Sequence, residues 1–452
     1  MSSGAAERAA DNLPKTVHVD DLLANGQGVG RDRGLVVFVS GALPGEEARI
    51  SVDAVKRSYL SAHATEILTP SPDRMPSHCP VFPRCGGCQT LHYRYAAQLL
   101  WKQRMVKNAL ERLAGLQGVA VAETVPSVLI EQTRYRNKAS LVCEFSQTSG
   151  RIGFYAARSH RIVPIERCPV LLPWLDDAVH ALAGLVESPP VLLRGVRHVV
   201  LRTGLARESL VMALCSPRER PELTACLPQL RKAIPGLSGI VASWDPPSEN
   251  AIFGRRFATL WGSQDTVERI SGLTFRFGTA SFFQINSSML ERIAADMLAE
   301  LRGAKRIVDL YCGVGTFAVL AGKRGTTATG VESSPAAVDE AAENAARNGV
   351  ANAAFECATA AEAVAGSRGR SLLEGADAVI LDPPRRGCEP EVLHALARHG
   401  VPRVLYLSCN PATLARDART LADSGYRLRR ATPFDMFAFT GHVEILSDFI
   451  LP

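Results

Sequence analysis

The second half of the chain alternates short apolar runs with longer amphipathic stretches. Apolar residues recur with helical spacing over residues 287–301, and compact runs rich in Val, Ile, Leu and Ala follow at regular intervals. These runs predict strands at 306–311, 327–332, 353–357, 376–381, 403–407, 427–433 and 443–451. Because helical patterns fill most of the gaps, the sequence predicts a doubly wound α/β sheet.

The N-terminal part shows a period of two residues instead. Alternating segments predict short strands, and several glycines between them mark turns. The strand segments are 17–22, 34–43, 47–56 and 59–68. A small β-barrel over residues 15–70 is the natural way for such strands to bury one face.

Three further regions complete the expected organisation. Residues 1–14 have no hydrophobic core and are expected to form a disordered tail. Residues 71–278 begin with a proline-rich linker and a helical pattern at about 89–116, and then give mixed strand and loop signals. We interpret them as a central mixed α+β domain, followed by the doubly wound domain at 279–452.

Length and composition describe a globular chain with more than one core. At 452 residues we expect two or three domains, and a hydrophobic content of 46% with 21% charged residues suits a soluble protein. No apolar run reaches membrane-spanning length, and the first residues lack a secretion signal. We therefore expect a cytoplasmic monomer with no membrane partner, in which the eleven cysteines are ligands, catalytic groups or buried thiols rather than disulfides.

Positive charge is concentrated between residues 84 and 138. Nine Lys or Arg stand there against three acids, and this excess equals the net charge of the whole chain, +6. Tyr93, Tyr95, Trp101 and Tyr135 lie among these cations. Such a mixture suits phosphate contact with base stacking, and an ordinary solvated helix face explains it equally well.

A cysteine at a predicted strand end is the first candidate for chemistry. The apolar run 404–407 is followed by Ser408, Cys409, Asn410 and Pro411, in which Asn410 is a good helix N-cap and Pro411 suits the first helical position. The positive end of that helix would favour a thiolate at Cys409, as a nucleophile requires. Taken alone, the stretch also fits a buried structural cysteine.

A glycine-containing loop follows the first strand of the doubly wound region. Gly313 and Gly315 permit a tight turn close to a ligand, and Glu332 ends the next strand, where an acid can accept hydrogen bonds from ribose hydroxyls. Phe317 stands near the position of a third glycine, so the dinucleotide fingerprint is incomplete. The pattern indicates a nucleoside ligand without a pyrophosphate, and S-adenosylmethionine is the obvious one.

A third strand end carries Asp382, Pro383, Pro384 and Arg385. Prolines directly after a buried strand hold a rigid loop at the edge where open α/β sheets bind ligands. Asp382 is therefore a candidate contact to the cofactor or the target base, with a plain turn as the alternative. Arg385 replaces the aromatic residue of an Asp-Pro-Pro-aromatic tetrad, which argues against methylation of a base amino group.

Cys79, Cys85 and Cys88 have the spacing Cys-x5-Cys-x2-Cys, with two glycines between the last two. Cys168 also precedes a proline and an apolar run, and we expect it to be a fourth ligand. Four thiolates suit zinc or a [4Fe–4S] cluster, and three grouped cysteines with one distant favour iron–sulfur. The alternative is a set of unrelated thiols.

These residues together resemble the bacterial RNA uracil-5-methyltransferase family. The resemblance covers nearly the whole chain and is closest to the 23S ribosomal RNA branch with a TRAM domain and an iron–sulfur cluster. The motifs that carry it are CPVFPRCGGC, YRNKA at 135–139, FFQIN at 282–286, DLYCGVGTF, LDPPRRG, LSCNPATLARD and GHVE at 441–444.

The resemblance implies a role for each matching position. S-adenosylmethionine would be bound by Gln284, Tyr311, Glu332 and Asp382. Cys409 would be the nucleophile and Glu444 the general base, and the cluster ligands would be Cys79, Cys85, Cys88 and Cys168. The implied reaction gives 5-methyluridine in 23S ribosomal RNA through a covalent bond from Cys409 to carbon 6 of uracil.

Two alternatives stay open. The same chemistry on transfer RNA is disfavoured because family members specialised for transfer RNA often lack the cluster cysteines. A non-catalytic RNA-binding iron–sulfur protein would need neither Cys409 nor Glu444.

Overall fold

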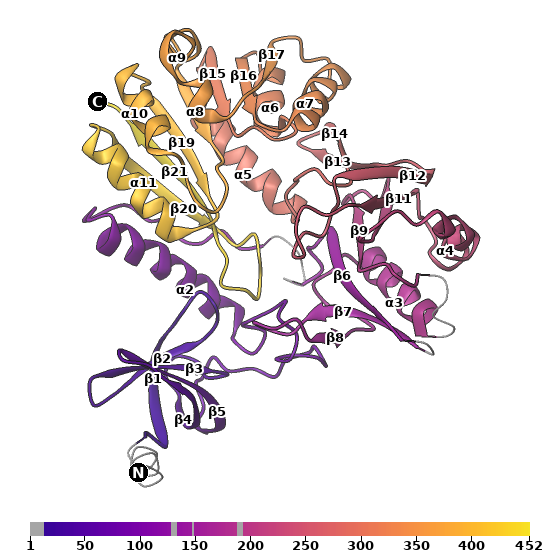
Figure 1. Cartoon of the computed structure of the whole chain (residues 1–452). Coiled ribbons are helices and arrows are strands. Elements are labelled where there is room, and N and C mark those ends of the chain that lie inside the picture. The colour runs from indigo at the N-terminus through magenta and orange to yellow at the C-terminus, as the bar shows by residue number, and fades with distance from the viewer. Residues whose placement is uncertain (1–12, 128–132, 147–148, 188–192) are drawn as a thin grey trace, which may run out of the picture. The chain divides into compact units, whose positions relative to one another are not determined.

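The computed structural model describes residues 13–127, 133–146, 149–187 and 193–452 (Figure 1). Most of the predicted disordered tail, residues 1–12, lies outside these ranges. The chain forms two compact units, one of Met1–Lys102 with Phe439–His442 and the other of Gln103–Ala438 with Val443–Pro452. No helix within the described ranges is long and apolar enough to span a membrane.

The first unit contains a closed five-stranded barrel in the order β1-β2-β3-β5-β4. Its strands are β1 Thr16–Leu22, β2 Gly28–Asp32, β3 Leu35–Ser40, β4 Glu47–Val55 and β5 Tyr59–Thr69. Alternate residues such as Val17, Val19, Val37 and Val39 point inward and are buried. This confirms the predicted small barrel.

The segment after the barrel carries the cysteine motif and leads into α2 (Tyr95–Asn108). The predicted helix start near residue 89 is wrong, because the preceding backbone is bonded elsewhere: the amides of Gln89 and Thr90 both donate to the carbonyl of Phe439, at 2.9 and 3.1 Å. Helix α2 continues into a π-helical turn, η1 (Ala109–Leu113).

The predicted stacking role of three aromatic residues is also wrong. Trp101 is 1% exposed and donates its indole N–H to the carbonyl of Leu22 in the barrel unit, at 2.9 Å. Tyr93 and Tyr135 are 4% and 2% exposed. Rings buried to this extent pack in a core and cannot stack on a base.

The second unit contains a central sheet of seven strands within the described ranges, in the order β12-β11-β10-β9-β6-β7-β8. The strands are β6 Lys138–Phe145, β7 Gly150–Tyr155, β8 Ile162–Pro164, β9 His198–Thr203, β10 Leu210–Cys215, β11 Gly239–Trp244 and β12 Arg256–Gly262. The helical segments of this region are α3 Pro173–Glu187, η2 Pro221–Cys226 and α4 Leu227–Ala233. A separate hairpin follows, made of β13 (Asp265–Ile270) and β14 (Leu273–Gly278).

The doubly wound sheet of the second unit has the order β17-β16-β15-β18-β19-β21-β20 (Figure 1). Its strands are β15 Arg306–Leu310, β16 Thr327–Glu332, β17 Ala353–Cys357, β18 Ala378–Leu381, β19 Arg403–Ser408, β20 Arg427–Phe434 and β21 Glu444–Ile450. The first five in sheet order run parallel, and β21 is antiparallel to both of its neighbours. Every predicted strand of this region is present within two residues of its expected ends.

Helices cover both faces of this sheet, as a doubly wound fold requires. They are α5 Ser287–Glu300, α6 Thr316–Lys323, α7 Pro335–Arg347, α8 Ala360–Ala363, α9 Gly366–Leu373, α10 Pro390–Arg398 and α11 Pro411–Asp423. Successive strand residues face opposite cores: Val308 and Leu310 pack with α8–α11, and Ile307 packs with α5 and α6.

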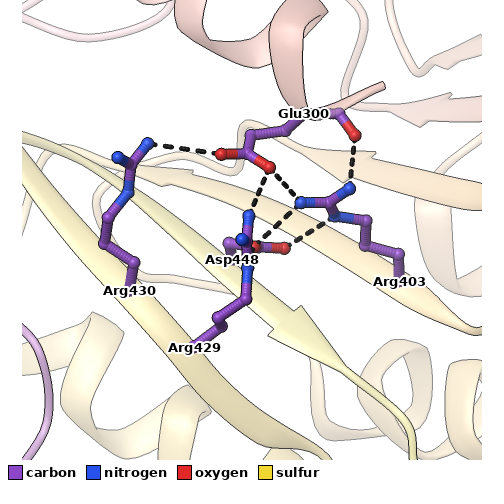
Figure 2. A network of polar contacts seen from close by, with 5 residues as sticks. All are labelled: Glu300, Arg403, Arg429, Arg430 and Asp448. Carbon is purple, nitrogen blue, oxygen red and sulfur yellow. Dashed lines mark hydrogen bonds and ion pairs between the residues drawn. The ribbon is translucent and has the colours of Figure 1, made fainter. Parts of the chain in front are cut away.

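A polar network ties the end of α5 to three strands of the sheet (Figure 2). Asp448 on β21 accepts two hydrogen bonds from Arg403 on β19, at 2.8 and 3.0 Å, and is also paired with Arg429 on β20. Glu300 pairs with Arg403, Arg429 and Arg430. Burial alone would raise the pKa of Asp448, but the hydrogen bonds from Arg403 and Arg429 hold it below its ordinary value.

Candidate active site

Four of the predicted site residues follow strand ends at one edge of the doubly wound sheet. Tyr311 follows β15, Glu332 ends β16, Asp382 follows β18 and Cys409 follows β19. These four strands are parallel, so their carboxyl ends meet at the same edge. The chain leaves β15 toward β16 on one side and returns at β18 on the other, which is the point where such sheets open a crevice for ligands.

The glycine-containing loop after β15 is held against Glu332. Tyr311, Gly313 and Gly315 all have positive φ, of 65°, 54° and 81°, so the backbone turns sharply here. The amide of Gly313 donates to Glu332 Oε2 at 3.2 Å, and Ser334 donates its amide to Oε1 at 2.9 Å. A side chain at Gly315 would come within 2.9 Å of Ala341 and Phe355. The loop and the acid are thus fixed relative to each other, as a nucleoside site requires.

Two further residues expected to contact the cofactor, Tyr311 and Gln284, differ in their hydrogen bonding. Tyr311 donates its hydroxyl to Glu389 at 2.7 Å, and burial raises the pKa of that hydroxyl. Gln284 is 8% exposed, and its side-chain amide makes no hydrogen bond to any residue that the structure describes. A buried amide with unused donors and acceptors is suited to bind a ligand.

Cys409 lies where the sequence predicts. Strand β19 ends at Ser408, and α11 begins at Pro411 with Asn410 as N-cap, whose side chain accepts from the amide of Ala412 at 3.0 Å. In the antiparallel pair of β19 and β21, Ser408 is the partner of Ile445. Cys409 therefore directly follows the last paired residue of β19, and Glu444 directly precedes the residue paired with Ser408 on β21.

The expected thiolate at Cys409 is wrong for this state of the protein. Burial and the negative charges of Glu444 and Asp382 raise the pKa of the thiol to about 11, and Arg385 acts in the opposite direction. The field of these carboxylates and the desolvation together outweigh the helix N-terminus. Cys409 is therefore a thiol at neutral pH until the balance of charge around it changes.

The carboxyl groups of the site are themselves perturbed. Burial raises the pKa of Asp382 to about 7, and burial with the nearby Asp382 raises the pKa of Glu444 well above its ordinary value. Glu444 is only 3% exposed. Carboxyl groups with raised pKa values in one crevice are typical of sites that transfer protons.

Sequence reasoning assigned no role to two residues of this site. Asp309 is fully buried and accepts the amide of Ala318 at 3.1 Å with Oδ2, while its Oδ1 has no partner among the described residues. Burial and Asp382 raise its pKa. Arg385 is the cation that acts on both Cys409 and Glu444. Its position in the sequence after two prolines at a strand end was the available signal.

The cysteine motif lies in the first unit, where Cys79, Cys85 and Cys88 are all half-buried. The amide of Gly87 donates to Cys85 Sγ at 3.4 Å, a contact that stabilises a thiolate ligand. Cys168 belongs to the second unit. Within the described residues no three His, Cys, Asp or Glu side chains are arranged to hold a metal ion, so the cluster stays a prediction from spacing and resemblance.

Comparisons with known proteins agree with this geometry. The model of the tRNA (uracil-5-)-methyltransferase family matches residues 266–447, and that of the TRAM domain matches residues 15–65. An uncharacterized RNA methyltransferase of Halalkalibacterium halodurans is 34% identical over 440 residues, 95% of each chain. One from Thermosynechococcus vestitus is 34% identical over 442 residues, 95% of this chain and 96% of the relative.

A solved structure extends the likeness to the whole fold. The tRNA (uracil-54, C5)-methyltransferase of Pyrococcus abyssi, in complex with S-adenosyl-L-homocysteine, has a TM-score of 0.74 and 27% sequence identity, and the match covers 96% of this chain and 100% of that one. With its TRAM barrel and its methyltransferase sheet, this chain belongs to the RNA uracil-5-methyltransferase family and is an S-adenosylmethionine-dependent enzyme.

Proposed function

We propose that this enzyme methylates carbon 5 of one uridine in 23S ribosomal RNA through a covalent bond between Cys409 and carbon 6 of the uracil ring. The observation that carries the proposal is that Cys409 directly follows β19 while Glu444 begins the paired strand β21, with Glu444 close enough to act on the pKa of the thiol. A thiol and a carboxylate at this spacing can reach adjacent atoms of one pyrimidine ring.

The chemistry requires both groups. Carbon 5 of uracil is a weak nucleophile, and addition of the Cys409 thiolate to carbon 6 converts the ring into an enolate with carbanion character at carbon 5. S-adenosylmethionine, when bound, would supply an electrophilic methyl group, which carbon 5 would take as the sulfonium sulfur keeps the bonding pair and leaves as S-adenosylhomocysteine. Glu444 then removes the hydrogen from the methylated carbon 5, and elimination restores the ring and frees Cys409. The raised pKa of Glu444 makes its ionised form a stronger base.

The methyl donor would be held by Gln284, Tyr311, Glu332 and Asp382. Glu332 offers an acid beside the turn at Gly313, and Gln284 offers an amide that no described residue occupies. The donor's positive charge would also oppose the carboxylates that raise the pKa of Cys409. Binding of the donor would therefore favour the thiolate.

Arg385 would also favour the thiolate of Cys409, because its charge lowers the pKa of the thiol. Addition to carbon 6 moves negative charge onto the ring, and a cation in the crevice stabilises that charge. Its effect on both Cys409 and Glu444 supports a place near the reacting ring.

A [4Fe–4S] cluster bound by Cys79, Cys85, Cys88 and Cys168 is part of the proposal. It is supported by the cysteine spacing and by the Gly87 hydrogen bond to Cys85. No step of the proposed reaction passes through the cluster. Action on ribosomal RNA implies a cytoplasmic enzyme.

Transfer RNA is the second candidate substrate. The similar enzyme from Pyrococcus abyssi acts on uracil 54 of transfer RNA according to its description. The cysteine motif favours ribosomal RNA here, because transfer-RNA members of the family often lack it.

Mass spectrometry of nuclease fragments tests the substrate directly. We expect one 5-methyluridine in 23S ribosomal RNA to disappear from cells lacking the gene and to return with wild-type protein but not with Cys409→Ala. Loss from transfer RNA alone would support the second candidate. No loss from either RNA would contradict the proposed function.

A further inference from the structure

The loop between β14 and α5 carries Gln284 and is fixed from outside by two residues of the central sheet. Arg202, on β9, donates to the carbonyl of Ser281 at 2.6 Å and to that of Phe283 at 3.2 Å. Asn137, directly before β6, donates its side-chain amide to the carbonyl of Gln284 at 3.0 Å and its backbone amide to that of Ile285 at 2.9 Å. The backbone on either side of Gln284, and at Gln284 itself, is thus bonded to the central sheet.

The same loop is also held at its ends. Asn137 donates to Ser287 Oγ at 3.0 Å, and Glu268 accepts the hydroxyl hydrogen of Ser287. At the other end, Glu340 on α7 accepts from the amide of Gly278 and from the hydroxyl of Ser281, both at 2.8 Å. The loop therefore has a single backbone path rather than a choice of several.

Burying the Arg202 guanidinium at this position is energetically unfavourable. It is 1% exposed, burial lowers its pKa to about 10, and Glu268 and Glu340 compensate its charge only at a distance. Its guanidinium lies 4.4 Å from the centroid of the Phe277 ring. An apolar side chain would fill such a site at less cost in desolvation, so stability alone does not explain a buried guanidinium. What it uniquely provides is a rigid fork that holds two carbonyls.

The fixed backbone determines what the loop presents. Phe283 stacks on Phe277 with ring centroids 4.2 Å apart, while Phe282 next to it is 73% exposed. Gln284 is buried with an amide that bonds to no described residue. Asn286 ends the loop as N-cap of α5. The backbone position from which the Gln284 side chain projects is thus preset before any ligand binds.

We propose that Asn137 and Arg202 are positioning residues for the methyl donor, which fix the loop so that Gln284 is preorganised to bind it. The inference rests on the proposed contact of Gln284 with the donor. It gives a role to the Tyr135–Ala139 motif, which the reaction itself leaves unused. Both positioning residues lie outside residues 266–447, so the central sheet is part of the donor site.

Calorimetric binding of S-adenosylhomocysteine to the full-length protein tests this without any RNA. We expect Asn137→Ala and Arg202→Lys each to weaken binding about tenfold, because alanine has no donor and lysine lacks the rigid fork that holds both carbonyls in place. Asn137→Ser, a milder change, should weaken it less. The matched control is Asn348→Ala, since Asn348 bonds both the amide and the carbonyl of Thr274 on β14, upstream of the loop.

Thermal melts without ligand separate positioning from stability. Weaker binding in the Asn137 and Arg202 variants, with Asn348→Ala destabilised to a similar degree but binding normally, supports the inference. Normal binding in the Asn137 and Arg202 variants, or equal weakening in Asn348→Ala, overturns it. If wild-type protein bound the ligand but methylated no RNA, the proposed function would fail while the inference would survive.

Discussion

Cys409 directly follows the last paired residue of β19, Ser408, and Glu444 directly precedes the partner of Ser408 on β21, Ile445. The Glu444 carboxylate acts on the Cys409 thiol and raises its pKa, so the two groups lie close enough to interact. The nucleophile and the base can therefore act on neighbouring atoms of one ring, although 34 residues of chain separate them.

Replacing Glu444 by Gln should stop the reaction after methyl transfer. The neutral amide keeps the buried shape but cannot accept the hydrogen from carbon 5, so the Cys409 adduct cannot be eliminated. We expect turnover to fall at least about 100-fold. Denaturing gels should show RNA bound to the variant protein with unmodified RNA as substrate. Free methylated RNA at the wild-type rate would exclude Glu444 as the base.

The alkylation rate of Cys409 should report the carboxylates around it. Burial and the charges of Glu444 and Asp382 raise the pKa of the thiol to about 11, so removing one negative charge lowers that pKa and increases the thiolate fraction at pH 8. Asp382, with a pKa of about 7, is ionised at this pH, and iodoacetamide should thus modify Cys409 faster in Asp382→Asn than in the wild type, as followed by peptide mass spectrometry. An unchanged or slower rate would show that these charges do not control the thiol.

The Asp448 network should contribute to stability and not to catalysis. Asp448→Asn removes the more buried of the two carboxylates paired with Arg403, Glu300 being the other, and should lower the free energy of unfolding by about 2 kcal/mol. The pKa of Asp448 is lowered in the fold, so its contribution is present above the ordinary pKa of Asp and is lost as the pH falls. Urea denaturation should show a smaller difference between the two proteins in acid.

A control for this prediction lies in the same network. Among the described residues the Arg430 side chain forms a single ion pair, to Glu300 at 3.3 Å, and it is 43% exposed. Arg430→Gln should cost less than about 1 kcal/mol. An equal loss in both variants would mean that burial of Asp448 is not the cause.

Iron should be present in protein purified without oxygen. We expect about four iron atoms and four acid-labile sulfides per chain, and loss of both in Cys85→Ser. Cys168→Ser should have the same effect if Cys168 is the fourth ligand, whereas Cys357→Ser, a cysteine on β17 in the methyltransferase sheet, should keep its iron. Stoichiometric zinc in place of iron would contradict the proposed cluster.

Local patterns predicted the elements of the methyltransferase sheet, because most of its strands are buried apolar runs and most of its helices are amphipathic. Local patterns also predicted the N-cap at Asn410 and the acid at the end of β16. The pairing of β19 with β21, out of chain order, is a property of the fold and cannot be seen in either segment alone. Without knowledge of this pairing, the sequence indicates only a surface acid at Glu444, and its role was predicted from the family resemblance alone.

The sequence predictions that are wrong share one cause, which is a contact with a distant part of the chain. The helix N-terminus at Cys409 is a local feature, whereas the carboxylates that raise its pKa come from distant segments. Trp101 lies in a basic stretch of sequence but is buried against the barrel strand that contains Leu22. Gln89 and Thr90 lie at the start of a helical sequence pattern, but their amides bond to Phe439, some 350 residues later. In each case a long-range contact outweighs the local pattern.

Trapping with 5-fluorouracil tests the covalent step most directly. Total RNA substituted with 5-fluorouracil contains both candidate substrates, and fluorine at carbon 5 cannot be removed as a proton. With S-adenosylmethionine present, we predict a complex that survives denaturation, in which peptide mass spectrometry finds the nucleotide on Cys409, and none with Cys409→Ala. If the wild-type protein gives no such complex, or if the nucleotide is attached to another residue, the proposed mechanism is wrong.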